Sequence, residues 1–417
     1  MNLKALTRRL IKSDVGLAVK IGFVLLQFNL IVLLLRSYYK ETKEKTKTSV
    51  NKKDIIIPVL VLSCNRSHYL NETLNSIFQA RSSNEEFGFI KFPVFVSQAC
   101  SDLLAQSVIE SFRKKLWAYI SFESNISEIT RNLNKINKGK RDVLTYSKIS
   151  DHYLKALNWV FGFHVETKSV KFYKSLYDFT KHKAVIIFED DLEVSTDIFK
   201  YFSALYPILQ NDTSLFCISA WNDYGHLSNV NRSSPEQLYR TDFFPGLGWM
   251  MLKSFWMEVK DEWPIVFWDE FLRLKFIKQN RQCIRPEISR TKTIGEVGSS
   301  ISDFYGKYLK YQFLNVEYID FSNVDLSYLN FHNFTKWWKN EILNESVEIS
   351  FDDFKSMKTY PMKFRIKYYS MEHFSIIASH LKMISDYRED CPRTSFKRTV
   401  TFVYKNSRVY LYPQNFN

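Results

Sequence analysis

The sequence has few glycines and prolines. Its 417 residues include 11 glycines and 10 prolines, less than half of ordinary usage, which is roughly 12% for the two together. This shortage excludes collagen-like chains, glycine-rich linkers and proline-rich segments. Apolar residues make up 45% and charged residues 24%, a balance typical of globular rather than disordered proteins. The length allows two or three domains of about 150 residues each.

Several common motifs are also absent. The sequence contains no G-x-G-x-x-G and no G-x-x-x-x-G-K-[ST] run, so a standard dinucleotide fingerprint or P-loop is not expected. The spacing of the five cysteines matches no zinc pattern. In an oxidising compartment an odd number of cysteines leaves one over. No internal repeat is visible.

The net charge of +14 is concentrated at the N-terminus. Residues 1–53 carry twelve Lys and Arg and three acidic residues, so they contribute +9 and the rest of the chain only +5. A nucleic-acid-binding protein usually spreads its basic residues over a folded face. Here they flank an apolar segment, which indicates a membrane and no nucleic acid.

Residues 15–35 are predicted to form a transmembrane signal anchor. Residues 21–35 carry no charge, and with the residues before them they approach the ~20 that cross a bilayer, while Lys20 reaches the headgroups. The positive-inside rule places residues 1–14 in the cytosol as a tail. Residues 36–53 read as a solvated stem. The body would then be luminal, unless the segment is a cleaved signal peptide. Glycosylation triplets in the body fit a luminal location: Asn71, Asn125, Asn211, Asn333 and Asn344.

After the stem, apolar runs typical of buried strands alternate with helical patterns. The strand-like runs are 55–63, 92–97, 184–188 and 214–219, and the helical ones are 69–80, 147–163 and 197–209. This alternation predicts an α/β fold with a parallel sheet and helices on both faces. Ligands bind beyond the carboxyl ends of such strands. The segments to search are therefore 64–66, 97–100, 189–193 and 221–225.

The pattern changes from about residue 316 to shorter, aromatic, alternating runs. Residues 318–328, 360–369 and 398–412 are of this kind. They predict a smaller, strand-containing second domain.

The residues Glu189, Asp190 and Asp191 follow the third strand-like run directly. Three adjacent acids repel one another unless something positive is bound. They are either a helix cap region or a site for Mn²⁺ or Mg²⁺ that in turn binds a nucleoside diphosphate. A luminal enzyme with such a site suggests a nucleotide-sugar donor.

Two further segments are candidates for a sugar site. Residues 267–270, FWDE, place acids beside aromatic rings, with one acid as a base, although surface helices often have this pattern. Residues 244–249, FPGLGW, indicate a tight turn whose glycines permit close approach of a ligand, or only a turn.

Six runs together resemble the N-acetylglucosaminyltransferase I family. Two are long and ordered, LYRTDFFPGLGW at 238–249 and CIRPEISRT at 283–291. The others are PVLVLSCNR at 58–66, FPVFVSQ at 92–98, FEDDLE at 188–193 and SAWND at 219–223. The likeness covers about residues 57–329, and the C-terminal part matches only loosely. The Golgi enzyme of this family adds N-acetylglucosamine in β-1,2 linkage to the α-1,3-linked mannose of N-glycans.

The resemblance implies a Rossmann-like nucleotide-sugar-binding domain of glycosyltransferase A type over residues 54–315, with a smaller C-terminal α+β domain over 316–417. It implies an inverting transfer from UDP-GlcNAc to a high-mannose (Man5) N-glycan with Mn²⁺ as cofactor. The expected location is the Golgi membrane, as a single-pass type II protein with a luminal catalytic domain.

The resemblance also implies roles for single residues. Asp191 would ligate the metal, and Asp269 would be the general base. The donor would be bound by Arg66 and His152 at the nucleotide portion, Glu189 and Asp190 at the sugar and ribose, and Ser300 at the diphosphate. Without the resemblance, a lone histidine such as His152 reads as a packed or surface residue. The implied disulfides join Cys64 to Cys100 and Cys217 to Cys283, and leave Cys391 free.

The chain departs from the family pattern at several positions, so it resembles a divergent member. Ala99 stands where the family has an aspartate that holds the uracil, and Asn65 replaces another aspartate. Glu296 and Val297 replace basic loop residues. Two alternatives stay open at this point: an O-mannose β-1,2-N-acetylglucosaminyltransferase, and a catalytically weak glycan-binding homologue.

Overall fold

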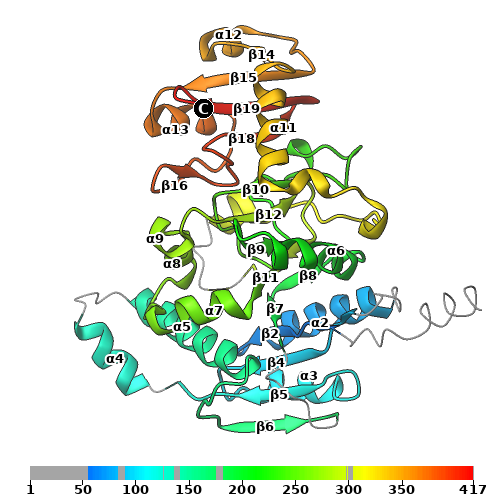
Figure 1. The fold of residues 1–417 in the computed structure, drawn as a ribbon. Coiled ribbons are helices and arrows are strands. Elements are labelled where there is room, and N and C mark those ends of the chain that lie inside the picture. The colour runs from blue at the N-terminus through cyan, green and yellow to red at the C-terminus, as the bar shows by residue number, and fades with distance from the viewer. Residues whose placement is uncertain are drawn as a thin grey trace, which may run out of the picture. The chain divides into compact units, whose positions relative to one another are not determined.

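The computed structural model describes residues 55–82, 90–124, 126–135, 141–174, 182–296, 298 and 304–416 (Figure 1). All of them belong to one compact unit, residues 55–417. The anchor predicted over residues 15–35 lies outside the described residues. Within the ranges just given, no helix is long and apolar enough to cross a bilayer.

In the described part of the chain, nine strands form the main sheet in the order β10-β12-β9-β11-β7-β2-β4-β5-β6. Its strands are β2 (Val59–Ser63), β4 (Val94–Gln98), β5 (Ala118–Ser121), β6 (Ser169–Phe172), β7 (Ala184–Glu189), β9 (Leu215–Ser219), β10 (Leu238–Thr241), β11 (Trp249–Leu252) and β12 (Gln282–Pro286). Two short pairs lie beside it, β1 (Ile55–Ile56) with β3 (Ile90–Lys91) and β8 (Leu192–Val194) with β13 (Thr291–Thr293).

The sheet is mixed, which corrects the prediction of a parallel sheet. The pairs β2–β4, β2–β7, β4–β5 and β9–β12 are parallel as expected. However, β11 runs antiparallel between β7 and β9, and the edge strands β10 and β6 are antiparallel to their neighbours. A strand buried on both faces has the same apolar pattern in either direction. Direction was therefore not readable from the sequence.

Residues 244–249 form the turn that leads into β11. Gly246 and Gly248 have φ of 70° and 87°, a region that L side chains rarely adopt. A Cβ atom on Gly248 would lie 2.6 Å from Cγ2 of Thr291. The glycines thus allow β11 to enter the middle of the sheet.

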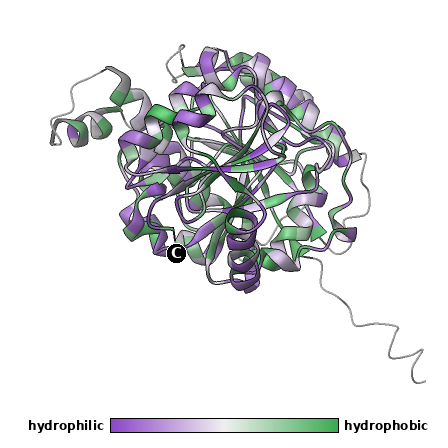
Figure 2. Cartoon of the chain, turned by 90° about the horizontal axis from the view of Figure 1, so that it is seen from above, coloured by the Kyte–Doolittle hydropathy of each residue, from purple (hydrophilic) through white to green (hydrophobic). Residues whose placement is uncertain are grey.

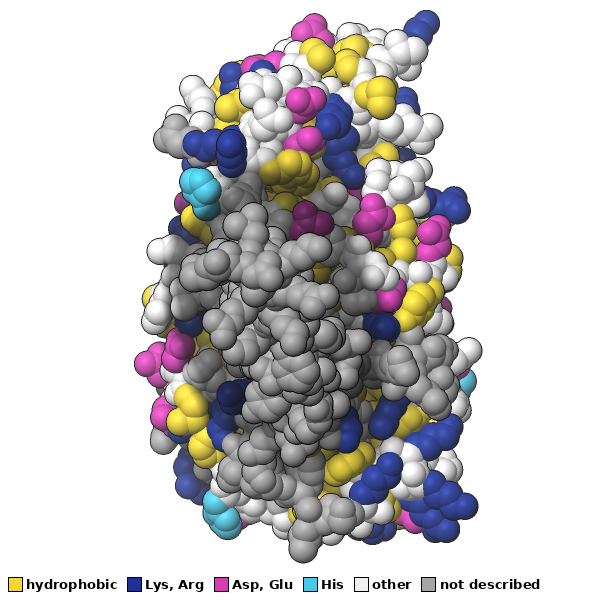
Figure 3. All heavy atoms as spheres, turned by 45° about the vertical axis from the view of Figure 1, so that its right-hand side comes forward, with side chains coloured by type: hydrophobic (Ala, Val, Ile, Leu, Met, Phe, Trp, Pro, Cys, Tyr) yellow, Lys and Arg dark blue, Asp and Glu magenta, His cyan; other side chains and the backbone are white. Residues whose placement is uncertain are grey.

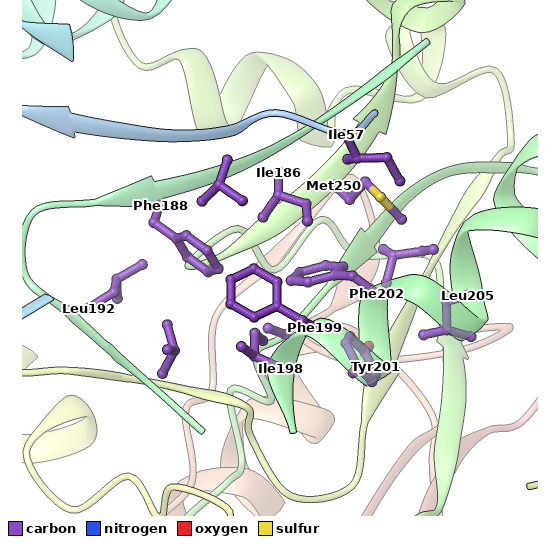
Figure 4. Packing of buried hydrophobic residues seen from close by; sticks show 14 of the residues in the cluster. Ile57, Ile186, Phe188, Leu192, Ile198, Phe199, Tyr201, Phe202, Leu205 and Met250 are labelled. Atoms are coloured by element: carbon purple, nitrogen blue, oxygen red, sulfur yellow. The ribbon is translucent and has the colours of Figure 1, made fainter. Parts of the chain in front are cut away.

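Helices cover both faces of the sheet. On one face lie α2 (Ser67–Ser82), α3 (Leu103–Ser111) and α6 (Ile198–Asn211), and on the other α5 (Arg141–Val160) and α7 (Lys253–Val259). Figure 4 shows Phe199 and Phe202 of α6 against Phe188 of the strand β7. The outer helices carry both hydrophilic and hydrophobic residues, as an amphipathic layer requires (Figure 2).

The predicted helices and strands of this part are confirmed, with small differences in their ends. The largest difference is α5, which begins at Arg141 rather than at residue 147. The shorter helices are α4 (Ile126–Lys135), α8 (Trp268–Arg273), α9 (Lys275–Lys278), α11 (Phe331–Leu343), α12 (Phe351–Ser356) and α13 (Met371–His380).

The C-terminal region contains a second sheet of the order β14-β15-β19-β18. Its strands are β14 (Val347–Glu348), β15 (Lys363–Tyr368), β18 (Val400–Tyr404) and β19 (Ser407–Pro413), and β16 (Tyr387–Arg388) pairs with β17 (Cys391–Pro392) nearby. Two of the three predicted runs are strands here. The run 318–328 instead forms the 3₁₀ helices η5 (Phe321–Asn323) and η6 (Ser327–Leu329). A domain boundary at residue 316 stays a prediction.

The cysteines pair as the resemblance implies. Cys64 is bonded to Cys100, and Cys217 to Cys283. Cys391 is a buried free thiol.

Candidate active site

The carboxyl ends of β2 and β7 meet at Asp190. The Ser63 hydroxyl donates to Oδ2 of Asp190 over 3.0 Å, and the Cys64 backbone N–H donates to the same oxygen over 3.3 Å. The guanidinium of Arg66 binds the other oxygen, Oδ1. Thr73 of α2 donates its hydroxyl to the Asp190 carbonyl over 2.8 Å. Burial raises the pKa of Asp190, against the opposing charge of Arg66. Both carboxylate oxygens are therefore committed to the protein.

Asp191 is held less completely. Nη1 of Arg66 lies 2.8 Å from its Oδ2, and the Asp191 side chain keeps 14% of its surface exposed. The segment after β13 closes against it, since a Cβ atom on Gly295 would lie 2.2 Å from Oδ2 of Asp191. Although burial acts in the opposite direction, the charges of Asp191 and Asp190 raise the pKa of Arg66. Arg66 thus remains a cation between two carboxylates.

Glu189, the last residue of β7, faces Tyr153 of α5. The Tyr153 hydroxyl donates to Oε1 of Glu189 over 2.9 Å. Burial, reinforced by the charge of Asp191, raises the pKa of Glu189 to about 7. Burial and the neighbouring Glu189 also raise the pKa of Tyr153. This carboxyl is therefore near half-protonated at neutral pH.

The predicted base, Asp269, approaches the same place from α8. Its neighbour Trp268 stacks on Tyr153 with ring centroids 4.0 Å apart. Trp268 also stacks against Trp249, at 6.0 Å and 11° between planes. Nη1 of Arg273, one helical turn on, lies 2.7 Å from Oδ2 of Asp269, and Asp269 is 39% exposed. The stack Tyr153–Trp268 therefore connects the Glu189 carboxyl with the helix that carries the exposed Asp269.

Other predicted residues are placed differently. His152 is buried, and its Nε2 lies 2.7 Å from the Ser97 hydroxyl at the end of β4. Burial lowers the pKa of His152 to about 3, so the ring is neutral. Ser300 lies outside the described residues. The predicted segment 221–225 has no hydrogen bond to the carboxylate cluster among the residues described here, and its Asp223 binds Arg393 at 3.0 Å instead.

Comparison with known proteins identifies the family at this point. The model of the GNT-I family matches residues 29–416. The chain belongs to the GNT-I family. An Arabidopsis thaliana protein named alpha-1,3-mannosyl-glycoprotein 2-beta-N-acetylglucosaminyltransferase is 33% identical over 360 residues, 85% of this chain and 73% of that protein.

Two solved structures show a remote likeness to this GNT-I family chain. Staphylococcus aureus TarS covers 69% of this chain and 75% of its own at 14% identity, with a TM-score of 0.34. The mannosyltransferase PcManGT from Pyrobaculum calidifontis, solved with GDP-Man and Mn²⁺, covers 53% of each chain at 13% identity, with a TM-score of 0.27. The family assignment rests on the sequence matches.

The donor set around Asp191 is compatible with one divalent ion. No group of three or more His, Cys, Asp or Glu residues in the described ranges could hold a metal by itself. Mg²⁺-like ions, however, are commonly bound by one or two carboxylates together with substrate phosphates. Asp191 suits that role because, among described side chains, only Arg66 binds its carboxylate. Asp190 does not, since both of its oxygens are occupied.

Tyr153 and Thr73 are site residues that sequence analysis missed. Tyr153 lies within the helical pattern 147–163 and Thr73 within the glycosylation triplet of Asn71, and neither pattern marks a site residue. The acidic cluster itself indicates such residues, because buried carboxylates require nearby hydrogen-bond donors. Tyr153 follows His152 directly, on a helix that was already expected to approach the donor.

Proposed function

We propose that this chain transfers N-acetylglucosamine from UDP-GlcNAc, in β-1,2 linkage and with inversion, to the α-1,3-linked mannose of N-glycans. This reaction initiates hybrid and complex N-glycan synthesis. Membership of the GNT-I family and the name of the Arabidopsis relative support the proposal. The observation that carries it is the Tyr153–Trp268 stack, which joins Glu189 at the end of β7 to the helix α8 that carries Asp269.

The donor would bind at the ends of β2 and β7. Asp191 would hold Mn²⁺ with the diphosphate, where the ion would supply positive charge to the departing UDP. Arg66 binds this carboxylate, and its guanidinium would bind the nucleotide portion of the donor. Glu189 and Asp190 are adjacent at this strand end and would contact the sugar and ribose, which for Asp190 requires Arg66 to release Oδ1.

The acceptor would bind beside Asp269, whose carboxyl is exposed at the surface of α8. Asp269 takes the proton of the mannose 2-hydroxyl as that oxygen attacks the anomeric carbon of the donor. The attack comes from the side opposite to the leaving UDP, so the α-linked donor becomes a β-linked product. The ion pair with Arg273 orients the Asp269 carboxylate for this step.

Two substitutions test the roles separately. Asp269→Ala should lower kcat by ~10²–10⁴-fold, the usual contribution of a general base, with UDP-GlcNAc affinity nearly unchanged. Asp191→Ala should abolish Mn²⁺-dependent UDP binding. Asp261→Ala, at an exposed carboxyl on the surface, is the matched control and should do neither.

The assay is mass-spectrometric detection of one added N-acetylhexosamine on a Man5 N-glycan with Mn²⁺, beside calorimetric titration with UDP. If Asp269→Ala lost UDP binding as strongly as it lost kcat, the assignment of Asp269 as the base would be refuted. Transfer to an O-mannosyl peptide in place of Man5 would favour the O-mannose enzyme. Absence of transfer and of hydrolysis by the wild-type chain would favour a glycan-binding homologue.

The cellular location belongs to the same proposal. Residues 15–35 would anchor the chain in the Golgi membrane with residues 1–14 in the cytosol and the catalytic body in the lumen. The apolar, uncharged character of residues 21–35 and the basic residues before them support this placement.

A further inference from the structure

A polar pocket of about 340 Å³ lies in the C-terminal region. It forms where β15 ends, α13 begins and residues 413–415 return to the sheet. Small-molecule sites commonly start near ~300 Å³, so one or two sugar rings fit the space. None of the residues assigned above to donor, metal or base lines this pocket.

Two oppositely charged side chains line the pocket without being paired. Asp390 and Arg398 are both exposed, and neither side chain forms an ion pair or hydrogen bond among the described residues. A carboxylate that accepts and a guanidinium that donates can together bind neighbouring hydroxyls.

An exposed aromatic ring borders the same pocket. Tyr369 is 65% exposed, and its ring stacks on His373 with centroids 5.2 Å apart and planes parallel to 1°. A sugar ring presents an apolar face of C–H groups, which packs on a flat aromatic ring. Because His373 already supports the Tyr369 ring, a ligand would lose little free energy by ordering it.

The lining selects among classes of ligand. Asp390 and Glu372 disfavour a phosphate, whereas Arg398 disfavours a cation, and the polar walls disfavour a lipid. On the face shown in Figure 3, the upper part of the molecule mixes acidic, basic and hydrophobic side chains and presents no patch of one sign. We propose that this pocket is a second saccharide-binding site, which takes a neutral, hydroxyl-rich sugar unit.

The pocket is connected to the candidate base through β16. Tyr387 lines the pocket, while the next residue, Arg388, binds Glu270 at 3.1 Å, and Glu270 adjoins Asp269. A branched glycan could therefore have one arm in the pocket and another at Asp269. If the bound sugar is an arm of the acceptor glycan, this inference rests on the proposed function. The sugar could also belong to a separate glycan, and in either case the pocket would bind it in the same way.

The test measures saccharide binding without turnover. The full chain is titrated with Man5 oligosaccharide by saturation-transfer NMR, in EDTA and without nucleotide. Tyr369→Ala and Arg398→Gln should each weaken binding at least fivefold. Tyr311→Ala removes a tyrosine that is similarly exposed, at 63%, but lies outside the pocket, and it should bind as wild type does.

Wild-type affinity in both pocket variants would overturn the proposal, as would absence of binding by the wild-type chain. Unchanged melting temperatures exclude misfolding as the cause of a loss. Because no transfer is measured, failure of the proposed function leaves this result intact.

Steady-state kinetics of Tyr369→Ala show whether the bound sugar belongs to the acceptor or to a separate glycan. A several-fold higher KM for Man5 only, and not for an acceptor limited to the reacting arm, assigns the pocket to the acceptor. Unchanged KM for both assigns it to a separate glycan.

Discussion

Replacing Glu189 by glutamine should stabilise the metal-free protein at pH 8. Burial raises the pKa of Glu189 from 4.5 to about 7. The folded state therefore holds a proton that the unfolded state releases between these two values. Stability is lost as the pH rises through this window, and the full loss is present above pH ~8. Glutamine stays neutral and still accepts the hydrogen bond from Tyr153.

The magnitude follows from the width of the window. The pKa of Glu189 is roughly 2.5 higher in the folded than in the unfolded state, and each pKa unit corresponds to about 1.4 kcal/mol. The substitution should therefore raise the free energy of unfolding at pH 8 by about 3 kcal/mol. This value is an upper figure because Glu189 keeps an exposed edge. At pH 5 the same reasoning gives a difference below about 1 kcal/mol. The substitution should weaken the contact proposed with the donor sugar, because an amide carries no negative charge, a trade of function for stability that is common at active sites.

The measurement is urea unfolding of both proteins at pH 5 and pH 8, in EDTA so that no divalent ion neutralises Asp191. Glu193→Gln, at an exposed carboxyl on β8, is the control and should change neither value. A gain that is the same at both pH values, or a loss at pH 8, would refute the reasoning.

Two other predictions concern the base and the anchor. Arg388→Gln removes the ion pair that Arg388 of β16 forms with Glu270, the neighbour of Asp269. We expect kcat to fall several-fold while UDP affinity is retained, as measured by steady-state kinetics and a UDP titration. A loss of UDP affinity equal to the loss of kcat would contradict this prediction. The full chain should stay with membranes after alkaline extraction, whereas a chain without residues 1–53 should be released; release of both would contradict an anchor at residues 15–35.

Several features of the protein were determined by its sequence alone. The α/β character, most helix and strand positions and the acidic cluster at the end of β7 were readable, because apolar periodicity and strand-end residues are local properties. The motif runs also led to the family, to the cysteine pairing and to Asp269 as a candidate base.

The tertiary structure decided what depends on partners distant in the chain. The antiparallel placement of β11 between β7 and β9 is one case, since a strand buried on both faces has no direction in its pattern. The neutral state of His152 is another, because it results from burial around the ring. The contact of Tyr153 with Glu189 on one side and Trp268 on the other required three separate elements to meet. Such contacts come from the packing of the whole chain, which no local pattern encodes.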